Sequence, residues 1–299
     1  MLRLQAPLPD EYTLATDDEL VDRIAGAKSA LGGRLVILGH HYQRDEVIRW
    51  ADAVGDSFLL ARFAADNERA TDIVFCGVHF MAESADVLTG DHQRVLLPDL
   101  NAGCSMADMA DLDQVEDAWD EIAAVSDIDR VVPITYMNSS AALKAFVGRH
   151  GGAVCTSSNA RAVLEWALAK GDKVLFFPDQ HLGRNTGFTM GFGAADMRVW
   201  NPHQDCGGLE ERDIKDATLL LWKGHCSVHQ RFRPAHIEAV RAEHPDVEVI
   251  VHPECAHDVV EMADRVGSTE RIQEWVQAAA PGSTLAIGTE IHMVQRLAR

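Results

Sequence analysis

A thiol and an imidazole lie three residues apart in the loop 222–229, as Cys226 and His229. This loop follows the apolar run 217–221, which predicts a buried strand. Both side chains are therefore expected at the carboxyl end of a strand, where ligands bind in open α/β sheets. A cysteine at such a position is a packing residue, a metal ligand or a nucleophile, and this loop alone leaves all three open.

The other cysteines bear on that choice. None of the six cysteines forms a CxxC pair, and no secretion leader favours a disulfide framework. Cys76 and Cys155 end apolar runs, where burial is the leading interpretation. Cys104 resembles Cys226, because each lies beside a glycine and polar residues in a loop after a predicted strand. We therefore expect Cys104 and Cys226 to bind a metal.

Acid–base side chains follow two other predicted strands. His40 and Tyr42 leave one strand together, and a tyrosine beside a histidine suits proton transfer, with a surface turn as the alternative. His252 and Glu254 leave another strand. They are interpreted as a general base pair or as groups that support metal ligands, with a structural hydrogen bond as an equal alternative. Cys255 beside them is interpreted as a packing residue.

Three loops place serine or threonine hydroxyls just before a predicted helix, at 54–57, 156–158 and 267–269. Hydroxyls and free backbone N–H groups at a helix start bind phosphate or carboxylate. Each loop alone is more often a simple helix cap. Three such loops, interleaved with the other polar clusters, favour a substrate with several anionic groups.

A repeated unit of apolar strand, polar cluster and amphipathic helix positions these groups. The predicted strands cover 34–38, 72–75, 94–97, 130–134, 152–154, 173–177, 217–221, 247–251 and 283–287. This alternation predicts parallel sheets with helices on their faces. An additional helix is predicted from the cap Thr16 to the glycines at 32–33. The glycine-rich run 182–193 is predicted to be a mobile loop, and 108–120 and 197–216 are candidate domain boundaries.

The composition excludes several classes of protein. A chain of 299 residues with 47% hydrophobic and 24% charged residues suits a globular protein of one large domain or two to three smaller ones. The net charge of −19 argues against nucleic-acid binding but is compatible with an anionic small substrate held by local donors. No apolar run suits a membrane span, so we expect a cytoplasmic protein.

Ten motifs, taken in order, resemble the quinolinate synthase (NadA) family. They cover almost the whole chain after residue 30, and their order makes the set specific. The motifs are GHHYQ (39–43), VGDS (54–57), GVHFMAE (77–83), PDLNAGCSMAD (98–108), TYMNSS (135–140), CTSSNA (155–160), PDQHLGRN (178–185), GHCSVH (224–229), HPEC (252–255) and GST (267–269).

The resemblance implies three similar αβα domains with parallel sheets around a pseudo-threefold axis. We place them at 1–110, with an N-terminal arm, at 111–222 and at 223–299. It also implies a [4Fe–4S] cluster held by three cysteines, which leaves one iron open as a Lewis acid. The implied reaction condenses iminoaspartate with dihydroxyacetone phosphate to quinolinate in NAD biosynthesis, and L-aspartate oxidase is a possible partner.

Site residues follow from the same resemblance. Cys104 and Cys226 match cluster ligands, and the catalytic positions are matched by Tyr42, His40, His229 and Glu254. Substrate-binding positions are matched by His40, Ser57, Tyr136, Asn138, Ser157, His252, Glu254, Ser268 and Thr269. The family's third cysteine follows the helix after the AIGTE strand, and no cysteine of this sequence matches it. We therefore expect a truncated form of a longer enzyme, or one in which the cluster is absent or unstable.

Two other functions are compatible with the same residues. A zinc hydrolase would use Cys104, Cys226 and His229, which are ligand types that zinc takes in proteins. A cluster-free binding protein of the same fold would keep the pocket and dock an aspartate-oxidising partner. Metal content separates these hypotheses from an iron–sulfur enzyme.

Overall fold

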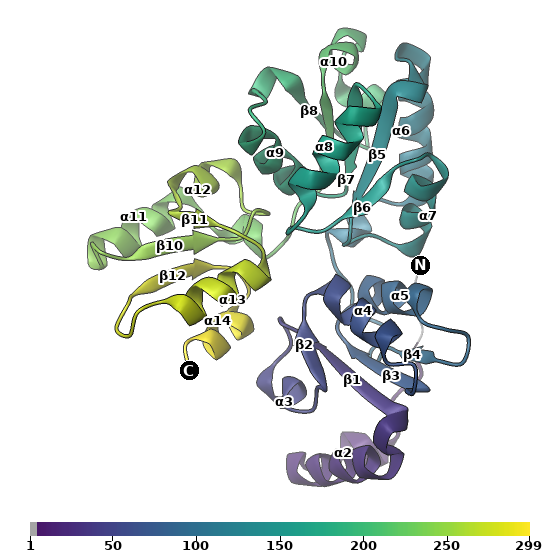
Figure 1. Ribbon diagram of the computed structural model, residues 1–299, viewed down its shortest axis with the longest axis vertical. Coiled ribbons are helices and arrows are strands. Elements are labelled where there is room, and N and C mark those ends of the chain that lie inside the picture. The colour runs from purple at the N-terminus through teal and green to yellow at the C-terminus, as the bar shows by residue number, and fades with distance from the viewer. Residues whose placement is uncertain (1–4) are drawn as a thin grey trace. The chain divides into compact units, whose positions relative to one another are not determined.

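Figure 1 shows the computed structural model of the chain, which describes residues 5–299. Residues 1–4, the start of the expected N-terminal arm, lie outside the described part. The chain divides into two compact units, one ending at Gly103 and the other running from Cys104 to Arg299. Three sheets are formed, and every strand pairing in the described chain is parallel, which confirms the predicted fold class. No helix within residues 5–299 is long and apolar enough to cross a membrane.

The first unit contains a four-stranded sheet in the order β2-β1-β3-β4. Its elements are α1 (Asp10–Thr13), α2 (Asp17–Leu31), β1 (Leu35–His40), α3 (Asp45–Ile48), β2 (Ala53–Gly55), α4 (Ser57–Asp66), β3 (Asp72–Cys76), α5 (His79–Leu88) and β4 (Arg94–Leu96). Helix α2 begins where the sequence predicts, because Thr16 and Glu19 cap each other's backbone N–H groups. It ends at Leu31 and is followed by Gly32, whose φ of 52° suits glycine.

The second unit contains a five-stranded and a three-stranded sheet. The larger sheet has the order β6-β5-β7-β9-β8 and the smaller one the order β11-β10-β12. The strands are β5 (Val131–Tyr136), β6 (Ala153–Cys155), β7 (Lys173–Phe177), β8 (Met197–Trp200), β9 (Leu219–Trp222), β10 (Glu248–Val251), β11 (Arg265–Val266) and β12 (Leu285–Gly288). The α-helices are α6 (Leu112–Val125), α7 (Ala141–Arg149), α8 (Ala160–Lys170), α9 (Gln180–Thr189), α10 (Glu211–Asp216), α11 (Pro234–Glu243), α12 (His257–Met262), α13 (Thr269–Ala278) and α14 (Ile291–Leu297).

All three sheets share one local topology. The chain leaves a central strand for a neighbour on one side, passes through a helix and returns to a neighbour on the other side. The central strands are β1, β5 and β10. Strand order reverses beside each of them, and in such sheets the crevice at the carboxyl ends of the reversing strands binds ligands. The fold therefore offers three equivalent positions for chemistry, as the repeated polar clusters of the sequence predict.

The nine predicted strands are all present, but the sequence reasoning missed three others, β2, β8 and β11. Each lies at the edge of its sheet. They are short and partly exposed, so they lack the apolar run that a strand buried on both faces requires. The segment 197–216 was a boundary candidate, yet it supplies β8, which pairs with β9 inside the five-stranded sheet.

The prediction of a mobile loop at 182–193 is wrong, because most of this run forms helix α9. Asp179 caps the helix by accepting hydrogen bonds from two of its first backbone N–H groups. The glycines serve packing. A Cβ at Gly183 would lie 2.7 Å from Leu221, and one at Gly187 would lie 2.7 Å from Met197 Sδ. Glycine therefore lets α9 lie closer to the sheet than any other residue would allow.

Candidate active site

A buried polar cluster lies at the carboxyl ends of β9 and β10 in the second unit. One ligand-type atom from each of Cys226, His229 and Glu254 lies within 4.8 Å of the other two. His229 and Glu254 are 1% and 3% exposed. The sequence predicted each of these residues separately, and the fold brings them together. The group has the donor types and spacing of a metal site.

The loop that carries Cys226 is fixed to the neighbouring strand end. Gln180 N–H donates to Gly224 O at 3.1 Å, and Trp222 Nε1–H donates to Met109 O at 2.7 Å. Gly224 permits this approach, since a Cβ there would lie 2.1 Å from Pro178 O. The segment that leads to the thiol is therefore held by two hydrogen bonds, one from the Trp222 side chain and one to the backbone of Gly224.

Glu254 is the centre of the cluster. His229 Nδ1 lies 2.7 Å from Glu254 Oε2, and the Tyr136 side chain also hydrogen-bonds to this carboxyl group. Burial opposes ionisation, but the His252 and His229 rings and the hydrogen bonds from His229 and Tyr136 lower the pKa of Glu254 well below its usual range. The carboxylate is therefore ionised at neutral pH although it is almost fully buried.

His252 is a neutral imidazole with a defined tautomer. Burial lowers the pKa of His252 to about 3, against the opposing effect of the Glu254 charge. Its Nδ1 accepts a hydrogen bond from Glu254 N–H at 3.3 Å, so the ring proton is on Nε2. The ring stacks on His229 with centroids 4.5 Å apart. Because His252 is neutral, the hydrogen bonds from His229 and Tyr136 sustain the Glu254 carboxylate at neutral pH.

The two predicted metal-binding thiols both lie near this carboxylate. Burial raises the pKa of Cys104 to about 11, and the charge of Glu254 adds to the shift. Burial followed by the Glu254 charge also raises the pKa of Cys226. Residues 122 positions apart (226 − 104) thus feel one charge. A bound cation would offset both effects and favour the thiolates, so the donor set fits a metal centre.

The predicted hydroxyl loops lie at helix starts. Ser268 is buried and caps α13 by accepting from Arg271 N–H, and Thr269 is the first residue of that helix. Ser157 lies half-buried between β6 and α8. Asn138 lies two residues beyond Tyr136, just after β5. The cap that Ser268 forms agrees with the structural alternative, while its burial at a strand end suits a ligand site as well.

The remaining predicted residues lie in the first unit. His40 is buried at the end of β1, and its Nδ1 accepts a hydrogen bond from Tyr42 N–H at 3.2 Å. The His40 and Tyr42 rings meet edge to face with centroids 4.7 Å apart. Ser57 is buried at the start of α4, which Asp56 caps. His40 pairs with Gly55 of β2, so these groups belong to one end of one sheet.

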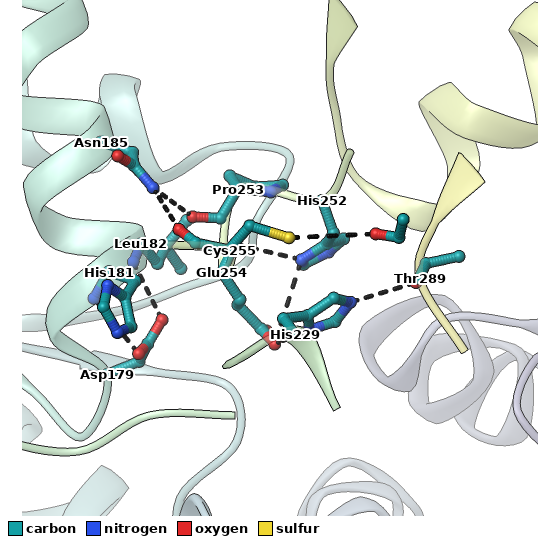
Figure 2. A network of polar contacts seen from close by, with 11 residues as sticks. Asp179, His181, Leu182, Asn185, His229, His252, Pro253, Glu254, Cys255 and Thr289 are labelled. Atoms are coloured by element: carbon teal, nitrogen blue, oxygen red, sulfur yellow. Dashed lines mark hydrogen bonds and ion pairs between the residues drawn. The ribbon is translucent and has the colours of Figure 1, made fainter. Parts of the chain in front are cut away.

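Figure 2 shows three residues of the network that sequence reasoning did not single out. Thr289 Oγ1 lies 3.1 Å from His229 Nε2. Asn185 Nδ2 donates to Pro253 O and to Cys255 O, each at 2.9 Å. Asp179 is fully buried, and burial together with the Glu254 charge raises its pKa well above the usual range. All three lie inside or beside motifs that the sequence displays, but nothing in their spacing reveals these contacts.

The parallel sheets and the cluster of thiols, imidazoles and carboxylate at their strand ends define an α/β enzyme with a metal-type active site. The sequence model of the family described as Quinolinate synthetase A protein (NadA) matches residues 22–299. The chain belongs to this quinolinate synthase family.

Curated relatives agree with the family match. The chain is 61% identical over 294 residues to quinolinate synthase of Corynebacterium glutamicum, covering 98% of this chain and 75% of the relative. It is 56% identical over 291 residues to that of Acidobacterium capsulatum, covering 97% and 78%. It is 55% identical over 291 residues to that of Streptomyces coelicolor, covering 97% and 74%. The similarity therefore extends over the whole site described above.

Proposed function

We propose that this chain is a quinolinate synthase of NAD biosynthesis that condenses iminoaspartate with dihydroxyacetone phosphate, releasing phosphate and water. One observation carries the proposal: Cys104, Cys226, His229 and Glu254, predicted from separate motifs, are linked electrostatically through one buried carboxylate. Identity of 50–61% to curated quinolinate synthases supports it. No comparison favours a zinc hydrolase or a cluster-free binding protein.

Cys104 and Cys226 would hold an iron–sulfur cluster, which we propose to be of the [4Fe–4S] type. Both thiols are half-buried, and the pKa of each is raised, so the thiolates require a cationic partner. When bound, such a cluster supplies an open iron that polarises a substrate oxygen as a Lewis acid. Cys155 and Cys255 are fully buried and serve as packing residues.

Glu254 is positioned to act as a proton acceptor, although its lowered pKa makes it a weaker base than an ordinary carboxylate. It is ionised, shielded from water and held by hydrogen bonds from His229 and Tyr136, so it accepts a proton from a carbon or nitrogen acid placed beside it. His252 presents a proton on Nε2, because its Nδ1 already accepts from the backbone. At neutral pH the ionised Glu254 therefore offers a substrate a proton acceptor, and the neutral His252 offers it a hydrogen-bond donor.

The remaining predicted residues are proposed to bind the anionic substrates or assist proton transfer. Tyr42 and His40 supply acid–base groups from the first unit, where their rings are in contact. The other proposed ligands of substrate carboxylates and phosphate are Ser57, Tyr136, Asn138, Ser157, Ser268 and Thr269. Three of these, Ser57, Ser268 and Thr269, lie at helix starts, where backbone N–H groups favour anions.

The domain arrangement, the cellular location and the partner belong to the same proposal. We place the domains at 1–110, 111–222 and 223–299 around a pseudo-threefold axis. The enzyme would act in the cytoplasm and receive its unstable imine substrate from L-aspartate oxidase. The net charge of −19 argues against nucleic-acid binding.

Anaerobic reconstitution with iron and sulfide tests the proposed function. A version of the protein that also carries the family's third cysteine should take up both elements and form quinolinate, whereas its Cys104→Ser and Cys226→Ser variants should lose iron and activity together. Cys206→Ser is the matched control, because Cys206 lies in the 3₁₀ helix Asp205–Gly208, outside the group formed by Cys226, His229 and Glu254. Quinolinate formation without iron or sulfide would overturn the proposal of an iron–sulfur cofactor. Bound zinc with hydrolytic turnover, or quinolinate binding in calorimetry without any metal or turnover, would favour the two alternatives.

A further inference from the structure

Both ring nitrogens of His229 have partners within the protein (Figure 2). Nδ1 lies 2.7 Å from Glu254 Oε2, and Nε2 lies 3.1 Å from Thr289 Oγ1. The three residues are 1%, 3% and 4% exposed, in the order His229, Glu254, Thr289. A buried chain of hydroxyl, imidazole and carboxylate thus joins the ends of β12 and β10.

The Glu254 carboxylate fixes the direction of the first hydrogen bond. An ionised carboxylate only accepts, so the proton on Nδ1 of His229 is donated to Glu254. When Nε2 carries no proton, it accepts a hydrogen bond from the Thr289 hydroxyl. A hydroxyl can also accept, so this contact persists if Nε2 carries a proton. No other side chain of similar size offers both possibilities except serine.

Thr289 is itself held in place. His252 N–H donates to Gly288 O at 3.3 Å, which ties the residue before Thr289 to the end of β10. Glu290, the residue after it, caps α14 by accepting from His292 N–H and Met293 N–H. The face of the His229 ring is covered by His252 at a centroid distance of 4.5 Å. The ring is therefore fixed on both edges and on one face.

We propose that Thr289 is a positioning residue that holds the His229 ring in one orientation, so that His229 acts through Glu254 and not on the substrate directly. The inference rests on the proposed function for its catalytic meaning. It refines the role of His229, since neither ring nitrogen is left to meet a substrate atom. Thr289 keeps the Nδ1 proton aimed at the carboxylate that performs the proton transfer.

The first test reads the ring itself and needs no turnover. In the chain labelled with ¹⁵N-histidine, NMR should show one narrow pair of ring ¹⁵N signals for His229, assigned by comparison with His229→Gln. Thr289→Val, which keeps the shape and removes the hydroxyl, should shift or broaden the Nε2 signal, while Thr289→Ser should keep the parent signals. Thr284→Val, at an exposed threonine, is the control. Unchanged His229 ring signals in Thr289→Val would overturn the proposal. If that variant fails to fold, Thr289→Ala is read in the same way.

The second test uses the reconstituted enzyme. Thr289→Val should lower kcat by about 10-fold with KM within about twofold, the cost of one lost hydrogen bond in the reacting state. Thr289→Ser should restore most of kcat. In a His229→Gln background, Thr289→Val should have no further effect, because it acts through that ring. Full additivity in the double variant, or equal loss in the serine variant with unchanged iron content, would overturn the proposal. If the reconstituted parent enzyme forms no quinolinate, the proposed function fails, and the NMR test still decides the role of Thr289.

Discussion

The ends of β1 and β10 use the same local device with different chemistry. In each, a buried histidine lies at the carboxyl end of the strand and its Nδ1 accepts from the backbone N–H two residues later, at 3.2 Å for His40 and 3.3 Å for His252. Both rings therefore carry their proton on Nε2. The residue that supplies the N–H differs: it is Tyr42 in the first unit and Glu254 in the second. Each strand end thus presents an imidazole Nε2–H donor. The residue two positions later decides whether a phenol or a carboxylate lies beside that donor.

Glu254→Gln should break the carboxylate side of this comparison and have the largest effect. The amide keeps the shape but removes the charge and the acceptor for the His229 Nδ1 proton. We expect kcat to fall by roughly 10²–10⁴-fold, the range for loss of a general base. The measurement is quinolinate formation at equal iron content, with circular dichroism to verify the fold. An unchanged rate would remove Glu254 from the catalytic residues.

Tyr42→Phe should break the phenol side. The ring contact with His40 survives, but the hydroxyl is lost, so we expect kcat to fall by about 10²-fold through loss of one acid–base group. Tyr12→Phe is the matched control, since Tyr12 is 45% exposed. If both variants turn over at the parent rate, the two strand ends are not chemically equivalent and only the second unit carries the proton transfer.

Asn185→Ala should sharpen the comparison by loosening only the β10 end. Asn185 is buried and donates to two carbonyls of the loop that contains Glu254, while its Oδ1 lies 2.9 Å from His257 Nδ1. Leaving these groups unpaired should lower the free energy of unfolding by about 2–4 kcal/mol. Urea denaturation measures this, and Asn67→Ala, which removes an exposed hydrogen bond, should cost less than about 1 kcal/mol. If both variants lose the same free energy of unfolding, the hydrogen bonds from Asn185 contribute no more to stability than an exposed one.

The pH dependence of stability should reveal the buried neutral His252. Its pKa is lowered to about 3, so below the ordinary histidine pKa of 6.5 the unfolded chain binds a proton that the folded chain does not. His252 therefore does not reduce the free energy of unfolding above about pH 6.5. As the pH falls from 6.5 towards 3, it lowers the free energy of unfolding by up to about 1.4 kcal/mol per pH unit. Urea denaturation from pH 7 to 5 should give a shallower slope for His252→Gln than for the parent. His244→Gln, at an exposed histidine, should leave the slope unchanged.

The central strands and their polar ends were predictable because burial on both faces requires continuous apolar runs, as in β5 and β7. Edge strands such as β11 carry no such signal. The run 182–193 misled because glycines at helical spacing also suit a loop, and their packing role depends on side chains such as Leu221 from a distant strand.

The residues of the candidate site were singled out from the sequence, but several of their hydrogen-bond partners were not. Cys226, His229 and Glu254 are reactive types after strands, which a sequence displays directly. Thr289 and Asn185 act through hydrogen bonds that span 60 to 70 positions. Such contacts depend on how two sheets meet, and neither residue type is distinctive by itself. Short-range patterns could not reveal them.

The glycines at 183 and 187 affect more than their immediate surroundings. They let α9 pack closely against β8 and β9, and Asn185 of the same helix donates a hydrogen bond to the loop that contains Glu254. A Cβ at either glycine would push α9 away from the sheet, and Asn185 would move with the helix. The two glycines therefore bear on the position of the Glu254 loop, although neither is among the residues proposed to bind the substrate.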